Sequence, residues 1–275
     1  EATPEVVVPS VDVAPETQLV GWRHRHLLDV DGLSGADLDL DADGVAGVIQ
    51  ELVSRNNPRS NVYIRPFIYK AGLELTPKLK GIRSSLAIYM IAFGDYFSMD
   101  VPLRVMVSSW TRISDNVIPS RGKITGGYIN SSLAKDQAEE GGYDDALLLN
   151  SDGKISEGSG ANLFIVRNGA LITSPINSDI LEGITRRSVL MFARDAGVPI
   201  EEREIDRSEM YVAEEAFFCG TGAQVAVIGS VDGRPVGSGE RGPITEQIQR
   251  TFFQCVRGED ATYSHLLTKV SVRPD

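Results

Sequence analysis

Hydrophobic positions recur along the chain with two different spacings, and each spacing predicts a type of element. Residues 44–56 place an apolar side chain every three or four positions, which predicts an amphipathic helix that ends before Pro58. Residues 184–196 repeat this pattern and are followed by Gly197, a typical helix stop. A third helix is predicted over 243–253.

Other apolar runs are rich in β-branched and aromatic residues, as expected of strands. Two such runs cover residues 62–69 and 85–92. Aspartate or asparagine followed by glycine separates β-rich runs at 152–153, 168–169 and 232–233. Such dipeptides are the strongest short-range signal for a hairpin. The later part of the chain is therefore predicted to be α+β, with antiparallel hairpins folded around a pocket.

Length and local composition suggest two domains. A chain of 275 residues can bury a substantial core in two modest domains. The segment that begins at Gly94 follows the second predicted strand and has the character of a connector. We therefore expect a small N-terminal domain over 1–93, an interdomain loop over 94–100 and a larger domain over 101–275.

Composition excludes several classes of protein. A net charge of −11 disfavours nucleic-acid binding, which needs clustered lysine and arginine. No stretch approaches the ~18 unbroken apolar residues of a membrane span, and the first residues lack the pattern of a signal peptide. Two cysteines, Cys219 and Cys255, are too few for a disulfide framework, so we expect a cytoplasmic protein. Cys219 is expected to be a small buried residue and not a nucleophile.

Two segments resemble metal sites superficially. His24 and His26 lack a cysteine or acidic partner at ligand spacing, which favours a solvated basic turn. From Asp39 the chain matches the first positions of an EF-hand loop, but Gln50 stands where the twelfth position requires glutamate. An acidic loop that leads into a helix is the better interpretation, and no metal is expected.

Four positions carry candidate chemistry. Lys123 lies among glycines that permit close approach of another group, and Glu157 follows the predicted turn at 152–153. Gly183 begins the helix over 184–196, whose free N–H groups suit a phosphate. Thr221 stands between two glycines. The first three also have an ordinary explanation when taken alone, respectively a solvated lysine, a surface glutamate and a plain glycine-led helix start.

In this order the motifs resemble fold-type IV enzymes that use pyridoxal 5′-phosphate (PLP), most of all branched-chain amino-acid aminotransferases. The resemblance covers residues 50–260. It is carried by three motifs, Arg121-Gly-Lys123-Ile-Thr-Gly-Gly-Tyr128, Ser156-Glu157-Gly-Ser-Gly-Ala-Asn162 and Leu181-Glu-Gly-Ile-Thr-Arg186. It implies a two-domain α+β fold with a small α/β N-terminal domain and a larger, β-rich pseudo-barrel domain.

The resemblance also implies a role for each site residue. Lys123 is the catalytic lysine that holds the cofactor aldehyde, Tyr128 bonds the phenolic oxygen, and Glu157 keeps the pyridine nitrogen protonated. The phosphate is expected at Gly183, Ile184, Thr185 and Thr221. Substrate is expected at Tyr63, Arg65, Phe93, Tyr96, Thr221, Gly222 and Ala223. The alternative for Tyr63, Arg65, Phe93 and Tyr96 is a strand and loop that pack the small domain.

The implied activity is transamination between leucine, isoleucine or valine and 2-oxoglutarate. The alternatives are a D-amino-acid or R-amine transaminase, an aminodeoxychorismate lyase, or a catalytically impaired PLP-binding relative. Amino acids and 2-oxo acids are the expected partners, and a homodimer or higher homo-oligomer is the expected assembly. Residues 1–45 depart from the family pattern, and Asp29 stands where the resemblance places a phosphate-binding arginine. An anion there predicts weakened cofactor binding.

Overall fold

The computed structural model describes residues 38, 40–94, 96–268 and 270. Its helices are α3 (Ala42–Asn56), α4 (Tyr128–Glu140), α5 (Ile184–Asp195) and α6 (Pro243–Val256), with short 3-10 helices η1 (Thr125–Gly127), η2 (Arg207–Tyr211) and η3 (Ala261–Leu266). Its strands are β1 (Val62–Lys70), β2 (Ser84–Ala92), β3 (Leu103–Thr111), β4 (Asp145–Leu149), β5 (Ile155–Gly158), β6 (Asn162–Arg167), β7 (Ala170–Thr173), β8 (Ile200–Glu202), β9 (Glu215–Gly220), β10 (Gln224–Val231) and β11 (Arg234–Pro235).

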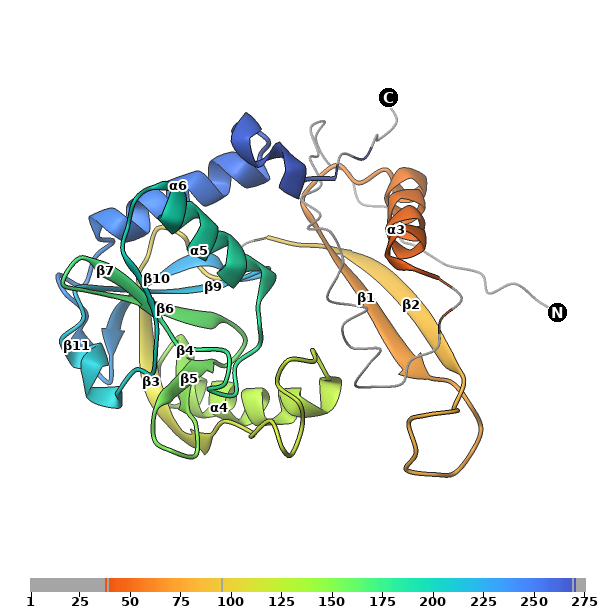
Figure 1. The fold of residues 1–275 in the computed structure, drawn as a ribbon, viewed down its shortest axis with the longest axis horizontal. Helices are drawn as coiled ribbons and strands as arrows, with labels where there is room; N and C mark the ends of the chain where they lie inside the picture. Colours follow the sequence, from red (N-terminus) through yellow and green to blue (C-terminus); the bar gives the residue numbers. More distant parts are fainter. Residues whose placement is uncertain (1–37, 39, 95, 269, 271–275) are drawn as a thin grey trace.

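The N-terminal described part is a two-stranded antiparallel sheet covered by one helix (Figure 1). Asp41 caps α3 by accepting a hydrogen bond from the Gly44 N–H, and Asn57 ends the helix in the left-handed conformation with φ 43°. The apolar face of α3 packs on Ile64 and Ile88 of the sheet. The predicted helix and both predicted strands are confirmed here.

The larger part is built on a nine-stranded sheet in the order β5-β4-β3-β10-β9-β6-β7-β8, with β11 paired to β10. Strand β5 lies at one end of this order and β6 lies well inside it. The two strands are nevertheless joined by a tight turn, in which the Gly158 N–H donates to the Ala161 carbonyl at 2.8 Å. The sheet must therefore curl, and the curl brings its first strand beside its sixth.

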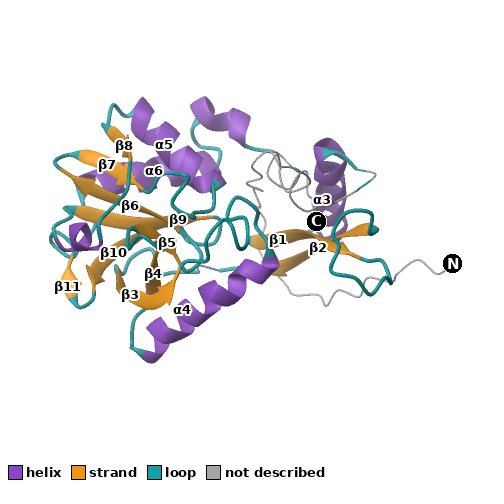
Figure 2. Ribbon diagram, turned by 60° about the horizontal axis from the view of Figure 1, so that its bottom comes forward, coloured by secondary structure: helices purple, strands orange, loops and turns teal. Residues whose placement is uncertain are grey.

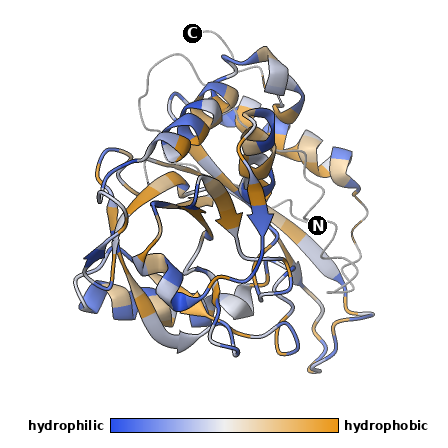
Figure 3. Ribbon diagram, turned by 60° about the vertical axis from the view of Figure 1, so that its left-hand side comes forward, coloured by the Kyte–Doolittle hydropathy of each residue, from blue (hydrophilic) through white to orange (hydrophobic). Residues whose placement is uncertain are grey.

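Helices cover the outside of this curled sheet (Figure 2). α5 and α6 pack on β6, β7, β9 and β10 through an apolar cluster that includes Phe164, Phe192, Phe217 and Phe252. α4 packs on β3 and β4 through small residues, Ala134 and Ala138 among them. Figure 3 shows the hydrophobic positions gathered along the strands. Among the described residues no helix is long and apolar enough to cross a membrane.

The predicted turns are found where expected. At 168–169 both residues have positive φ, 51° and 72°, as the hairpin between β6 and β7 requires, and 232–233 repeats this with 51° and 75°. The hairpin at 152–153 joins β4 to β5. The helices predicted at 184–196 and 243–253 correspond to α5 and α6.

The expectation of antiparallel hairpins throughout is incomplete. β3 pairs with β4 and with β10 in parallel, and β7 pairs with β8 in parallel. The parallel β3–β4 pair needs a crossover, and α4 supplies it. The sequence did not predict α4, because its buried positions are Ser131, Ala134 and Ala138, which give almost no apolar pattern. Because α4 was not predicted, the parallel pairing of β3 with β4 was not predicted either.

Candidate active site

A cavity of about 430 Å³ lies between the curled sheet and the β1–β2 hairpin. Its lining brings together all of the site residues predicted from sequence. They are Tyr63, Arg65, Phe93, Tyr96, Lys123, Tyr128, Glu157, Gly183, Ile184, Thr185, Thr221, Gly222 and Ala223. Residues from the β1–β2 hairpin and from the larger sheet therefore converge on one site.

Lys123 lies in the loop between β3 and α4, two residues before η1 begins at Thr125. Its ammonium is 5.2 Å from the centroid of the Tyr128 ring, at the start of α4. The loop is fixed on its other side, because the Ser120 N–H and hydroxyl both donate to Asp115 Oδ1, at 3.0 and 3.1 Å. A lysine exposed on such a braced loop can reach into the cavity while its backbone stays in place.

Glu157 is the last but one residue of β5 and is almost fully buried. Its Oε2 accepts hydrogen bonds from Asn162 Nδ2 at 2.9 Å and from the Leu181 N–H at 3.1 Å. Its Oε1 lies 2.7 Å from Arg112 Nη2. Burial raises the pKa of the Glu157 carboxyl, and the charge of Arg112 opposes that shift. The result is a carboxylate held in one orientation at the inner end of the pocket.

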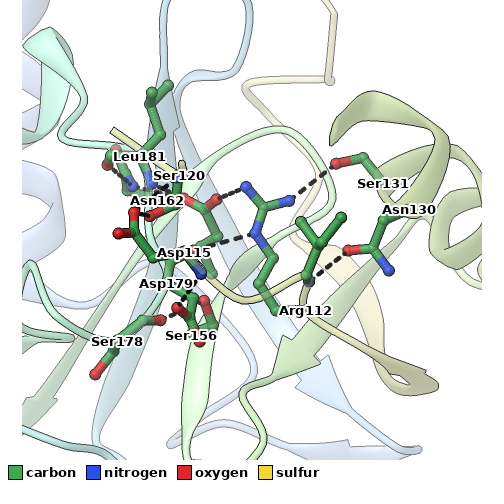
Figure 4. Close-up of polar contacts among 12 residues, drawn as sticks. Arg112, Asp115, Ser120, Asn130, Ser131, Ser156, Asn162, Ser178, Asp179 and Leu181 are labelled. Carbon is green, nitrogen blue, oxygen red and sulfur yellow. Dashed lines mark hydrogen bonds and ion pairs between the residues drawn. The ribbon is translucent and has the colours of Figure 1, made fainter. Parts of the chain in front are cut away.

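Arg112 is a pocket residue for which no role was predicted (Figure 4). It follows β3, and its guanidinium also donates to the Asp179 carbonyl and to Ser131 Oγ, at 3.2 and 3.3 Å. The sequence signal was an arginine directly after a strand that leads to the lysine loop. Nothing local indicated that Glu157 would be its partner.

The N-terminus of α5 forms another wall of the cavity. Gly183 caps this helix without a side-chain hydrogen bond, and Ile184 and Thr185 follow it along the cavity wall. A Cβ at Gly183 would collide with Asn162 Oδ1, so only glycine lets the helix start approach β6 this closely. Helix N-termini carry partial positive charge and free N–H groups, which suit a phosphate.

The opposite wall is aromatic and comes from the β1–β2 hairpin and the loop after it. The rings of Tyr63 and Phe93 lie 5.3 Å apart, and the Arg65 guanidinium is 5.5 Å from the Tyr63 centroid. Tyr89 pairs directly with Arg65 across the two strands and also lines the cavity. The hydroxyls of Tyr63 and Tyr89 raise the pKa of Arg65. Tyr89 was not predicted, because strand pairing alone places it there.

The segment after β9 closes the site between these walls. A methyl group at Gly222 would lie 3.7 Å from Phe93 Cζ and 3.8 Å from Tyr96 Cγ, which is ordinary contact. The Thr221–Gly222 turn therefore faces the aromatic wall. Cys219, just before it, is fully buried as expected, and burial raises the pKa of its thiol. It is an inert packing residue.

Several predictions lie outside the described residues. They concern His24, His26, Asp29 and Asp39. Of the acidic segment, Asp41 is described and caps α3, which agrees with an acidic loop that leads into a helix.

The donor set fits PLP. An amine, a buried carboxylate and a glycine-started helix N-terminus face one cavity, and these are what an aldehyde, a pyridine nitrogen and a phosphate require. The close approach at Gly183 is the specific observation, since an added Cβ would collide with the Asn162 side chain that holds Glu157.

Comparisons with known proteins define the class of this chain. The family model "Amino-transferase class IV" matches residues 29–231, so the chain belongs to the class IV aminotransferases. It is similar to the probable branched-chain-amino-acid aminotransferase of Aquifex aeolicus, with 46% identity over 85% of this chain and 76% of that protein. The corresponding protein of Synechocystis is 39% identical, over 84% of this chain and 75% of that protein.

Solved structures agree with this assignment. The branched-chain aminotransferase of Thermoproteus uzoniensis with norvaline has a TM-score of 0.89 and 38% identity, over 94% of this chain and 87% of that one. The PLP form of the Thermobaculum terrenum enzyme has a TM-score of 0.87 and 38% identity, over 91% and 83%. The predicted family, enzyme class and fold class are confirmed, and the second structure agrees with the predicted cofactor.

Proposed function

We propose that this chain is a PLP-dependent aminotransferase that exchanges an amino group between branched-chain L-amino acids and 2-oxoglutarate. The observation that carries the proposal is the division of one cavity into two chemically different sides. One side presents Lys123, Glu157 and the start of α5, while the other presents aromatic rings and a single arginine. The relatives named above support the choice of branched-chain substrates.

The first side would hold the cofactor. Lys123 would hold the aldehyde carbon, Tyr128 the phenolic oxygen and Glu157 the pyridine nitrogen. The N–H groups at Ile184 and Thr185 and the Thr221 hydroxyl would hold the phosphate. When bound, PLP supplies an aldehyde that can accept an amino group and a ring that withdraws electrons from the bond being broken.

Lys123 also moves the proton. As a free amine, Lys123 would accept the proton that leaves the substrate Cα and would donate it again at the carbon that carried the aldehyde. The contact with the Tyr128 ring keeps the lysine chain at this side of the cavity. The braced loop around Ser120 limits the movement of its backbone.

The second side would select substrates. Tyr63, Phe93 and Tyr96 offer apolar ring surface to an aliphatic side chain, and the backbone at Gly222 and Ala223 offers N–H groups to the substrate carboxylate. Arg65 would pair with the distal carboxylate of 2-oxoglutarate. One pocket can thus serve both half-reactions.

The assembly, location and domain limits are part of the same proposal. We infer domains over 1–93 and 101–275 joined by residues 94–100, and the separate sheets support this division. A homodimer is supported by exposed apolar side chains on β1 and β2, namely Phe67, Tyr69, Tyr89 and Ile91. Two free, buried cysteines support a cytoplasmic location. Light scattering of the purified protein tests the dimer.

The activity is tested with purified protein, PLP and defined substrate pairs. Leucine, isoleucine or valine with 2-oxoglutarate should give glutamate and the matching 2-oxo acid, detected by chromatography. D-alanine and an (R)-arylamine serve as parallel donors, and aminodeoxychorismate tests the lyase. Turnover of one of these with none from leucine would favour the corresponding alternative. A visible cofactor band without any turnover would favour the impaired PLP-binding relative.

A further inference from the structure

Arg112 and Glu157 form an ion pair that is almost completely withdrawn from solvent. Their side chains are 11% and 6% exposed, and the closest N–O distance is 2.7 Å. Arg112 uses each of its three nitrogens, because Nη1 donates to Ser131 and Nε to the Asp179 carbonyl (Figure 4). Ser131 and the Asp179 carbonyl thus hold the Arg112 guanidinium against the Glu157 carboxylate.

The backbone on both sides of Arg112 is also fixed. The Asn130 side chain on α4 accepts from the Ile113 N–H at 3.1 Å and donates to the Thr111 carbonyl at 2.9 Å. Asp179 adopts the left-handed conformation with φ 58°, which is uncommon for a residue other than glycine. Its own carboxylate accepts from the Asp115 N–H at 2.9 Å. Arg112 is therefore positioned by the protein alone.

A buried carboxylate without a counter-ion takes up a proton, since burial disfavours its charged form. Arg112, Lys123 and Arg186 are the cationic groups that act on Glu157, and the thiol of Cys219 also lies close to it. Lys123 is assigned to the cofactor aldehyde, and Arg186 pairs with Glu202 at 2.7 Å. Arg112 is thus the one of these cations that is in contact with the carboxylate.

We propose that Arg112 is a positioning residue that keeps Glu157 ionised and aimed, so that the proton shared with the pyridine nitrogen rests on the nitrogen. This inference rests on the proposed function. Without Arg112 the same proton moves from the ring nitrogen to Glu157 Oε, which leaves a neutral carboxyl and a neutral pyridine. A neutral ring withdraws electrons less well, so the proton on the substrate Cα is harder to remove.

The test follows the ring nitrogen directly. Holoenzyme is loaded with PLP labelled with ¹⁵N at the ring, and the ¹⁵N chemical shift is measured in the original protein and in four variants. Glu157→Gln should give the signal of an unprotonated pyridine. Arg112→Met should move the signal most of the way to that value, whereas Arg112→Lys should stay near the original. In the Glu157→Gln background, Arg112→Met should add no further shift.

The same set of variants includes controls for folding and for the interpretation of the ¹⁵N signals. Circular dichroism and thermal unfolding verify each variant, and Arg112→Gln replaces Arg112→Met if the latter does not fold. An unchanged signal in Glu157→Gln would show that Glu157 does not meet the ring nitrogen, which contradicts the proposed function itself. A shifted signal in Glu157→Gln with an unchanged signal in Arg112→Met, or in Arg112→Gln where that variant replaces it, would overturn the role of Arg112 alone.

Discussion

The two sides of the pocket differ in how their polar groups are held. On the inner side Glu157 and Asn162 are buried, the Arg112 side chain is only 11% exposed, and the three are joined by a hydrogen bond and an ion pair. On the outer side Tyr89 and Tyr96 are 41% and 51% exposed, and Arg65 is exposed as well. The protein itself therefore holds the polar groups of the inner side in place, whereas the polar groups of the outer side are exposed to solvent.

The supporting structure explains this difference. The inner side stands on a nine-stranded sheet with helices packed on it, while the outer side stands on a two-stranded sheet with one helix. A two-stranded sheet has little independent stability, so its side chains adapt more easily. The cofactor is the same in both half-reactions and benefits from rigid, preorganised partners. Two substrates with different side chains need a surface that accepts both.

Removal of the inner lysine should have the largest effect. Lys123→Ala should lower the rate of transamination by at least about 10²–10⁴-fold, because no other group would move the Cα proton. Borohydride should no longer attach PLP covalently to the chain, as read by peptide mass spectrometry. Lys154→Ala is the matched control, since Lys154 pairs with Asp206 away from the cavity. Label found on another lysine of Lys123→Ala would refute the assignment.

Loss of Arg65, on the outer side, should affect the reaction with 2-oxoglutarate more than the reaction with leucine. Arg65→Met should lower kcat/KM for 2-oxoglutarate by roughly 10- to 100-fold, the value of a charge-assisted hydrogen bond, and affect leucine far less. Arg65→Lys keeps the charge and should recover part of the loss. Steady-state kinetics with leucine and with 2-oxoglutarate measure the two values of kcat/KM. An equal loss for leucine and 2-oxoglutarate would mean that Arg65 only packs the hairpin.

A methyl group at the start of α5 should disturb the inner side. Gly183→Ala should push Asn162 away from Glu157, weaken PLP binding and lower the free energy of unfolding by about 1–3 kcal/mol. Gly160→Ala is the control for unfolding, because its added Cβ would meet nothing within 4 Å. Denaturant unfolding and PLP titration measure both quantities. An unchanged free energy of unfolding and an unchanged PLP affinity in Gly183→Ala would contradict the close approach of Gly183 to Asn162.

The smallest expected effect belongs to the outer side. Tyr89→Phe should lower kcat/KM for 2-oxoglutarate by an amount that corresponds to about 0.5–1.5 kcal/mol of activation free energy, because Arg65 loses one hydroxyl neighbour while the ring remains. Leucine should be unaffected. Tyr69→Phe, farther along the same face of β1, is the control. A loss as large as that of Arg65→Met would show that the outer side is as rigid as the inner one.

Local signals in the sequence determined much of this protein. Helical periodicity predicted α3 and α5, a further helix was predicted where α6 lies, and the three hairpin turns were predicted from residues that tolerate positive φ. Lys123 and Glu157 were found because their motifs occur in a recognisable order. Each of these signals is local, since it depends on the residues of one short segment and on the backbone conformations that they allow.

The tertiary structure alone decided which distant groups meet. α4 packs with small side chains and gives no periodic signal, so both it and the parallel β3–β4 pair emerge only in the folded chain. Arg112, directly after β3, meets Glu157 on β5 although β4 lies between these two strands in the sheet, and Tyr89 meets Arg65 through the register of β1 and β2. Burial then strengthens the contact between Arg112 and Glu157, because water no longer competes for the charges.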